Sequence, residues 1–162
     1  MPIYVRINGI EGDVTAKGFE KWIEANSIRF AVERNVNTKP GSVANRESTK
    51  PSLTAVILTK YLDKASPHLF NESCVGKDKT VQISVCRTGE TISSYLEYNL
   101  ANVIVSFYQV SVATNSSGSL VPVEEIQLNF GKIEMKYIPY NQKNQPGSPI
   151  PAGYDLATAA KI

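Results

Sequence analysis

The chain has 162 residues, with 17 basic and 15 acidic side chains and a formal net charge of +2. This length suits one domain with its own apolar core, and the near balance of charge gives no electrostatic reason to expect nucleic acid as a partner. No apolar run approaches the ~20 residues that span a bilayer, and the opening segment MPIYVRINGIEGD lacks the basic and apolar regions of a cleaved signal peptide, so we expect a chain made in the cytoplasm without membrane insertion.

Polar and apolar residues alternate with a period of two along most of the chain, which is typical of β-strands with one buried face. In the first such segment one face carries Ile3, Val5 and Ile7. In the second, SIRFAVE, the apolar face carries Ile28, Phe30 and Val32. Arg29 lies on the opposite, polar face of that segment. Both segments therefore predict strands with one face on the core.

Residues 35–52, NVNTKPGSVANRESTKPS, contain two prolines, one glycine and few apolar side chains, which predicts a long loop. Loops of this length are uncommon in compact domains and usually have a function, such as contact with a partner. The segment LTAVILTKYL follows and is apolar on both faces over much of its length, as in a strand covered on both sides. TVQISVCR then alternates again, with Cys86 on the face opposite Val81 and Ile83.

Two longer predicted strands change the parity of their apolar residues partway along. In SYLEYNLANVIVSFYQV the apolar set moves from Leu96, Tyr98 and Leu100 to Val103, Val105 and Phe107. In VEEIQLNFGKIEMKY it moves from Ile126, Leu128 and Phe130 to Ile133, Met135 and Tyr137. A strand keeps one face on the core through such a change only by inserting an extra residue, so we expect β-bulges at Ala101–Asn102 and at Gly131. Long, bent strands of this kind suit a barrel or a tightly curved pair of sheets.

One helix is predicted, over residues 67–75. Ser66 suits the N-cap, Pro67 the first helical position, and Gly76 the residue after the last turn. The i, i+4 spacing of Phe70 and Cys74 places both on the stripe that faces the core. We therefore expect a plain amphipathic helix of two to three turns.

Residues that could carry catalysis are few and scattered. His68, the only histidine, lies roughly 240° around the helix axis from Cys74, so the two do not form a nucleophile and its base. Together with Cys86 they match no zinc-ligand spacing, and we expect both cysteines to be free thiols. Glu124 and Glu125 are neighbours in a strand and point to opposite faces, unlike a catalytic carboxylate pair. We expect no enzyme, no catalytic residue, no metal and no cofactor.

The fold class that these segments predict is mainly β. The segments include one short α-helix at about residues 67–75 and a long loop at 35–52. The barrel domain covers residues 1–140. Residues 141–162 are rich in proline, glycine and amides, and we expect an irregular tail that packs on the same domain or on a neighbour.

A family resemblance rests on segments spread over nearly the whole chain. They are VRINGIEGD, WIEANSIRFAVER, ILTKYLDKASPHLFNESCVGK, ISVCRTGE, YLEYNLANVIVSFYQV, EEIQLNFGKIEMKYIP and GYDLATAAKI. The most specific are TKYLDKASPHL, which runs into the helix, and LNFGKIEMKY near the end. In this order they resemble the haemolysin-coregulated protein (Hcp) family of bacterial type VI secretion.

The resemblance implies a small antiparallel β-barrel of two curved sheets with one short flanking α-helix. It also implies that the chain is a structural subunit of the type VI secretion inner tube. Such subunits form hexameric rings that stack into a tube, with a contractile sheath around it, a spike protein at its tip and small effectors in its lumen. The chain would then be cytoplasmic during assembly and secreted afterwards. Arg29 matches the position of the family's lumen-facing polar residue. For ring stacking or subunit contact we expect residues of the long loop: Lys39, Ser42, Val43, Asn45, Arg46 and Glu47.

The sequence leaves two questions open: a second possible function for the chain, and the role of one polar row. A monomeric β-barrel could bind sugar or peptide through surface aromatic side chains, since the chain has eight tyrosines. A polar row of Lys132, Glu134 and Lys136 could be either subunit contact or free surface. The mass of the particle in solution separates a ring from a monomer.

Overall fold

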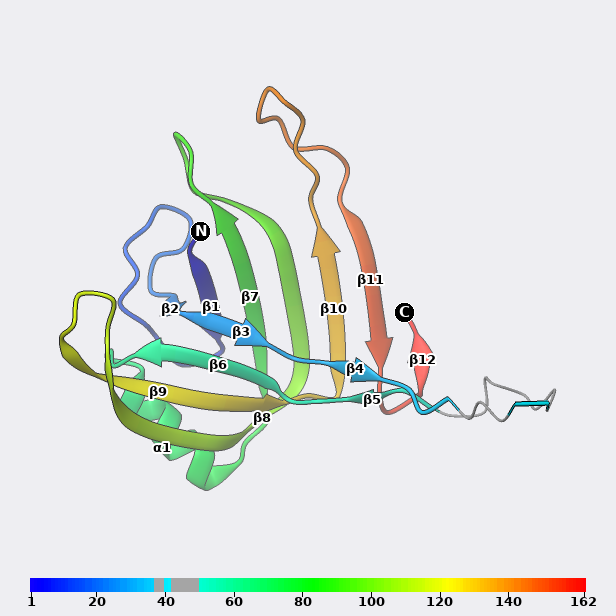
Figure 1. The fold of residues 1–162 in the computed structure, drawn as a ribbon, viewed down its shortest axis with the longest axis horizontal. Coiled ribbons are helices and arrows are strands. Elements are labelled where there is room, and N and C mark those ends of the chain that lie inside the picture. The colour runs from blue at the N-terminus through cyan, green and yellow to red at the C-terminus, as the bar shows by residue number, and fades with distance from the viewer. Residues whose placement is uncertain (37–39, 42–49) are drawn as a thin grey trace.

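A computed structural model describes residues 1–36, 40–41 and 50–162. It confirms the mainly β class: strands form two curved antiparallel sheets, and one helix lies beside them (Figure 1). The elements are β1 (Ile3–Ile7), β2 (Ile23–Ala25), β3 (Ser27–Arg29), β4 (Val32–Glu33), β5 (Ser52–Leu53), β6 (Val56–Tyr61), α1 (Ser66–Val75), β7 (Lys79–Arg87), β8 (Ser93–Thr114), β9 (Leu120–Asn129), β10 (Lys132–Tyr137), β11 (Ile150–Asp155) and β12 (Ala160–Lys161).

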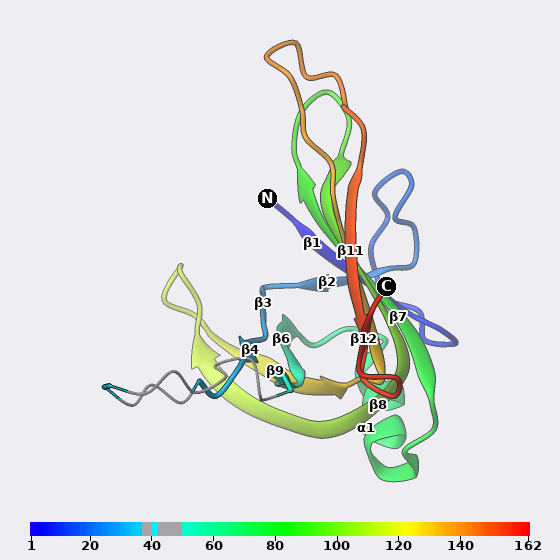
Figure 2. The same ribbon diagram turned by 90° about the vertical axis from the view of Figure 1, so that its right-hand side faces the viewer.

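The two sheets share strand β8. Sheet A has the order β12-β11-β10-β8-β7-β1-β2, and sheet B has the order β3-β6-β9-β8. β8 is long enough to serve both, because its first half pairs with β7 and β10 and its second half pairs with β9. In Figure 2 sheet A stands upright and sheet B runs across below it, with α1 beneath the corner between them.

The corner in β8 lies where the parity change predicts a bulge. The register with β7 shifts between Leu100 and Val103, and Asn102 takes a left-handed backbone with φ of 51°. This confirms the bulge at Ala101–Asn102 and its effect, since the strand bends sharply and keeps apolar residues inward on both sides of the bend. Leu100 and Val103 are both buried.

Gly131 is a sharper break than the predicted bulge. The predicted single strand is two strands, β9 in sheet B and β10 in sheet A, and Gly131 lies between them. Its N–H donates to the Ala101 carbonyl at 3.0 Å, which ties this corner to the corner of β8. A Cβ at Gly131 would lie 3.2 Å from the Asn102 Cβ, so glycine lets the two corners approach each other.

A second bulge in β8 overturns the prediction for Phe107. The register with β9 shifts between Val105 and Phe107, which reverses the faces that follow. Phe107 is therefore exposed, and Tyr108 points inward instead. Serine at 106 carries no parity signal, because the residues around it are apolar at both parities.

The predicted barrel is not closed. The turn from β2 to β3 joins the two sheets on one side, where the Asn26 N–H donates to the Thr59 carbonyl at 2.7 Å. Among residues 1–36, 40–41 and 50–162, no strand pairing links the short β4–β5 ladder to β10 or β11 on the other side. The core therefore lies between two sheets that open toward β10 and β11.

The core is built from the inward faces of both sheets and one helix residue. Fully buried members are Val5, Val56, Leu58, Leu69, Val81, Ile83, Val103, Ile126 and Leu128. Burying each such side chain stabilises the fold by about 1.5–3 kcal/mol. The alternation read from the sequence thus predicts the core face of β1, β7 and β9 correctly, whereas β6, expected to be covered on both sides, has one buried face and one partly exposed face.

The helix begins one residue earlier than predicted, and a different side of it contacts the core. It ends at Gly76 as expected, with φ of 68°. Its N-cap position is Ala65, and Ser66 is already helical, with a buried side chain. Cys74 is exposed rather than on the core face, because Leu69 supplies the apolar contact of this helix. Both cysteines are free.

The polar face of β7 is partly covered. Ser84 and Cys86 are buried, although the alternation predicts that their face is polar. The loop between β1 and β2 lies here: the Phe19 ring is 4.9 Å from the ring of Tyr4, whose strand position faces Ser84, and Trp22 contacts Phe19 edge to face. Aromatic side chains of this loop therefore cover part of the face of sheet A that the alternation predicts to be exposed to solvent.

The C-terminal segment is more regular than predicted. β11 pairs with β10 along its whole length and β12 pairs with β11, so residues 150–155 and 160–161 extend sheet A. The proline at 151 lies within β11, and its missing N–H does not prevent the pairing that the other residues make. The expectation of an irregular tail is therefore wrong for these residues.

Candidate functional site

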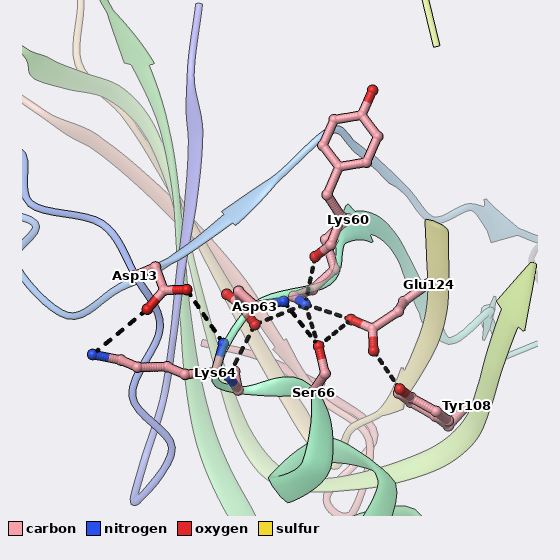
Figure 3. Close-up of polar contacts among 9 residues, drawn as sticks. Asp13, Lys60, Asp63, Lys64, Ser66, Tyr108 and Glu124 are labelled. Carbon is pink, nitrogen blue, oxygen red and sulfur yellow. Dashed lines mark hydrogen bonds and ion pairs between the residues drawn. The ribbon is translucent and has the colours of Figure 1, made fainter. Parts of the chain in front are cut away.

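A buried cluster of charged and polar side chains lies where α1 begins (Figure 3). Lys60 on β6 and Glu124 on β9 are direct register partners and are 1% and 0% exposed. Their strand positions match those of Val56 and Leu58 on β6 and of Ile126 on β9, so both charges point inward with the apolar core. A buried charge is tolerated only when it is paired and hydrogen-bonded.

Every hydrogen of the Lys60 ammonium has an acceptor. The ammonium contacts the Glu124 carboxylate and lies 2.9 Å from Asp63 Oδ1. It also donates to the Tyr61 carbonyl at 2.8 Å and to Ser66 Oγ at 3.2 Å. These four oxygens replace the water that a lysine loses on burial.

The Glu124 carboxylate is satisfied at both oxygens. Oε2 accepts from Lys60 and from Ser66 Oγ at 2.9 Å, and Oε1 accepts from the Tyr108 hydroxyl. Burial, together with this hydrogen bond to an anion, raises the pKa of Tyr108 above its ordinary value. The cluster therefore keeps Tyr108 neutral and donating.

The same cluster holds the first turn of α1. The Asp63 side chain accepts from the Ala65 N–H at 2.9 Å, and Ser66 Oγ accepts from the Asp63 N–H at 3.1 Å. Just outside, Lys64 Nζ lies 3.8 Å from Asp13 Oδ1 in the β1–β2 loop. Phe70, one turn further along the helix, lies against Tyr108 with ring centroids 6.0 Å apart. The cluster thus joins the helix to both β6 and β9.

The geometry of the Lys60–Glu124 cluster suits a structural role and not catalysis. Lys60 is matched to two carboxylates, and Glu124 has no surface that a substrate could reach. Within the described part of the chain, no three His, Cys, Asp or Glu side chains lie close enough together to hold a metal ion. His68 and Cys74 are both exposed. Glu124 and Glu125 point to opposite faces of β9, as the sequence predicts.

The sequence carries a signal for this cluster that the strand analysis missed. Lys60 shares parity with Val56 and Leu58, and Glu124 shares parity with Ile126 and Leu128. Two opposite charges, each on the core face of its strand, indicate a buried pair once those strands are neighbours. The pairing of β6 with β9, 64 residues apart, supplies the missing condition.

The outer face of sheet B is the second candidate surface, and it carries Arg29. Arg29 is exposed there, with Nη2 3.9 Å from Glu125 Oε2. Beside it the Ser27 and Thr59 hydroxyls are 2.6 Å apart. Gln127 Nε2 donates to Glu125 Oε1 at 3.5 Å. The inner face of the sheet is thus apolar, and its outer face mixes polar side chains with Ile57 and Phe107 and carries an exposed arginine at the β3 edge.

The sequence also predicts contact residues in the long loop and a polar row near the end of the chain. Lys39, Ser42, Val43, Asn45, Arg46 and Glu47 lie outside the described residues. The row of Lys132, Glu134 and Lys136 lies on sheet A and makes ion pairs within the chain, from Lys132 to Glu134 at 2.8 Å and from Lys136 to Glu97. No helix in the described residues has the length and apolar character that crossing a bilayer requires.

We predict that Lys60→Met lowers the free energy of unfolding by about 3–5 kcal/mol, because it leaves Glu124 buried without a counter-charge. The double variant Lys60→Met, Glu124→Leu removes both charges and should regain much of this loss. Lys64→Met is the matched control: its ion pair with Asp13 is exposed, so the expected loss is under about 1 kcal/mol. Urea unfolding of the three variants measures the differences, and an equal loss in all three would contradict the prediction.

We predict that Tyr108→Phe costs about 1.5–3 kcal/mol at pH values near 8, because a buried carboxylate loses its donor. The pKa of Tyr108 is raised in the folded state, so its contribution is complete below the unfolded tyrosine pKa of about 10 and is lost as pH rises further. The difference in stability between wild type and Tyr108→Phe should therefore shrink above about pH 10. Tyr137→Phe, at an exposed ring, should follow wild type throughout; a constant gap for Tyr108→Phe would contradict the assignment.

Comparisons with known proteins agree with this fold. The family model for the type VI secretion system effector Hcp matches residues 4–137. Protein hcp1 of Pseudomonas aeruginosa is 29% identical over 111 residues, and the match spans 66% of this chain and 66% of that relative, slightly under two thirds of its length.

Solved structures show the same architecture over nearly the whole chain. A type six secretion system protein has a TM-score of 0.91 at 26% identity, with 99% of each chain covered. Hcp1 from Salmonella typhimurium has a TM-score of 0.78 at 25% identity, covering 99% of this chain and 98% of its own. A type VI secretion system effector from Yersinia pestis, at 24% identity and a TM-score of 0.71, shows the fold alone. The chain belongs to the Hcp family of type VI secretion system effectors.

Proposed function

We propose that this protein is a structural subunit of the type VI secretion inner tube. Copies assemble into hexameric rings, the rings stack, and the tube carries or stabilises small effectors in its lumen. The observation that carries this proposal is the match to the Hcp family over residues 4–137, supported by a TM-score of 0.91 to a type six secretion system protein. The polar cluster around Lys60 is buried and holds the fold together, which fits a protein that works by assembly.

The proposed partners follow from the same reasoning. They are further copies of this chain, a spike protein at the tip, a contractile sheath around the tube and small effectors inside it. The protein would be assembled in the cytoplasm and then secreted. No enzymatic step belongs to this role.

The outer face of sheet B is the surface that we assign to the lumen. It carries the polar side chains of Ser27, Thr59 and Glu125, while the inner face of the same sheet packs in the core, and Arg29 is its exposed cation at the β3 edge. A ring repeats this arginine around the channel, so the charge of one residue is multiplied by symmetry. Stacking through the loop after β4 is part of the same proposal, and the β4–β5 pairing of Val32 with Leu53 marks the two ends of that loop.

A monomeric binding module is the competing function. The observation in its favour is an apolar groove near Leu53 and Met135 that an extended peptide could enter. The two functions differ in the mass of the particle, which a single measurement resolves.

We predict that the purified protein forms particles of at least six times the subunit mass of 17.8 kDa. Size-exclusion chromatography with light scattering measures this mass, and electron microscopy of the same fraction should show annular particles. The measurement is repeated over a wide range of protein concentrations, because ring assembly obeys mass action. A monomer at every concentration would overturn the tube function and favour the binding module.

We predict that Arg29→Glu reduces the retention of at least one small effector co-expressed with the ring. The change reverses the charge that every subunit presents to the channel, and it places two carboxylates together where Glu125 now pairs with Arg29. Arg29→Gln removes the charge without adding repulsion and should have a smaller effect. Lys17→Glu, in the exposed β1–β2 loop, is the control and should retain effectors as wild type does.

Effector retention is measured by co-purification with the intact ring. Light scattering of each variant first establishes that the ring has formed, so that a loss of effector is read only from assembled particles. Unchanged retention of every effector in Arg29→Glu would remove Arg29 from the lumen.

A further inference from the structure

The outer face of sheet A is hollowed over strands β1, β7, β8 and β10. The hollow has a volume of about 320 Å³, and its charged and amide side chains are Arg6, Asn8, Gln82, Asn99, Lys132 and Glu134. Four of these residues form one row across the sheet, each the direct register partner of the next: Arg6, Gln82, Asn99 and Glu134. Register partners on neighbouring strands project from the same face, so these side chains stand side by side.

Three members of this row have no polar partner within the described part of the chain. Arg6 is exposed and forms no ion pair with any described residue. The side-chain amides of Gln82 and Asn99 neither donate nor accept a hydrogen bond there. Lys132, in contrast, lies 2.8 Å from Glu134. The hollow therefore offers one free guanidinium and two free amides, and we call Arg6, Gln82 and Asn99 the open row.

The β1–β2 loop forms an aromatic wall beside the open row. In Figure 2 this loop lies on the side of sheet A that faces away from sheet B. A second hollow of about 270 Å³ adjoins the first, because Gln82 and Asn99 line both, and its other wall includes Phe19 and Trp22. The two rings meet edge to face with centroids 5.2 Å apart, which holds the indole in place. Trp22 is only half-buried, so part of its surface is open to a ligand.

The backbone under the hollow is already paired. β7 lies between β1 and β8, and β8 lies between β7 and β10, so both strands are interior strands of sheet A. Extended peptides gain their main-chain hydrogen bonds by adding to a free sheet edge, which this surface does not offer. Side chains must therefore supply the polar contacts, and they suit a compact ligand that carries its own donors and acceptors.

We propose that the hollow binds a short saccharide that carries a carboxylate, such as a disaccharide containing a uronic acid. The Arg6 guanidinium binds the carboxylate with two parallel hydrogen bonds. The amides of Gln82 and Asn99 each offer donors and an acceptor, which match sugar hydroxyls that also donate and accept. The indole of Trp22 covers the apolar C–H face of a sugar ring. An aromatic wall with a few placed polar groups is typical of sites for small molecules.

The charges of the lining favour a carboxylate over a phosphate. Phosphate carries more charge and is usually held by several cations or by a run of free backbone N–H groups. Among the described residues that line the hollow, Arg6 is the one cation without an ion-pair partner, since Lys132 is held by Glu134. A single guanidinium matches a single carboxylate. The volume lies at the lower end of the range for small-ligand sites, about 300–1,000 Å³, which fits one or two sugar rings.

This inference goes beyond the proposed function and does not rest on it. The hollow is on the outer face of sheet A, whereas the surface assigned to the lumen is the outer face of sheet B. A secreted protein with such a site would carry its own affinity for acidic sugar polymers, separate from anything held in the channel.

Titration with matched pairs of disaccharides tests the proposal. The probes contain glucuronate, galacturonate or mannuronate, and each has a neutral counterpart in which CH2OH replaces the carboxylate. Trp22 is the only tryptophan of the chain, so its fluorescence reports contact at the aromatic wall, while calorimetry measures the affinity. We expect at least one uronate disaccharide to change the Trp22 emission and to bind about tenfold more tightly than its neutral counterpart, because only the acidic member engages Arg6.

Substitutions in the open row separate the two kinds of contact. Arg6→Gln should weaken binding of the uronate disaccharide about tenfold and leave its neutral counterpart unchanged. Gln82→Leu should weaken both members of the pair, because the amide contacts hydroxyls that they share. Both positions are exposed, so the urea midpoints should match wild type. Lys143→Gln removes an exposed cation from the β10–β11 loop and is the control that should bind as wild type does.

The outcomes separate this site from the proposed function, because binding is measured on the purified protein whatever its mass. Absence of binding for all three uronate disaccharides at about 10 mM overturns the proposal. Equal affinity for acidic and neutral members, or unchanged affinity in Arg6→Gln, also overturns it. Inorganic phosphate or trialanine that binds as tightly as the uronates overturns the saccharide assignment. A monomeric wild type overturns the tube function and leaves this site standing.

Discussion

The pairing of Lys60 with Glu124 is the constraint on which the lower half of the molecule depends. The two residues face each other across β6 and β9, and a slip of one residue in that register would turn one of them to the outer face and leave the other unpaired. Their shared partners Asp63 and Ser66 begin the helix, and Tyr108 adds the second half of β8. A buried pair adds little net stability against an apolar one, but it penalises wrong pairings strongly. We infer that it specifies register and helix position together.

The second constraint is the pair of corners at Asn102 and Gly131. They lie against each other, joined by the hydrogen bond from Gly131 to Ala101, and both chain segments pass there from one sheet to the other. Because both bend at the same place, the inner faces of sheets A and B meet in one core. The same bend leaves the sheets open toward β11 and lets the β8–β9 hairpin project at the opposite end. The proposed lumen face is thus a consequence of one backbone turn.

Individual residues show which structural features the alternation of polar and apolar residues predicts and which it does not. The parity change at Ala101–Asn102 predicts a real bulge, because an apolar face cannot otherwise stay on the core. Phe107 is predicted wrongly, since a second bulge at Ser106 follows a run that is apolar at both parities. Cys74 and Ser66 are predicted wrongly because the helix has one strong apolar contact, Leu69, and its first turn is held by a charged cluster from distant strands. The alternation along the strands could have indicated the buried charged cluster, because Lys60 and Glu124 both lie at positions that face the core.

The amino-acid sequence alone determined the β class, the position of the helix, most of the inward faces and the resemblance to the Hcp family. The first three depend on interactions between residues close in the chain, which repeat every two or every three to four positions. The resemblance depends on the order of specific motifs along the chain. Only the tertiary structure decided that β6 lies beside β9, that Lys60 meets Glu124, that the barrel stays open and that residues 150–155 extend sheet A. Each of these depends on which distant segments become neighbours, and alternation along one strand contains no information about its partner.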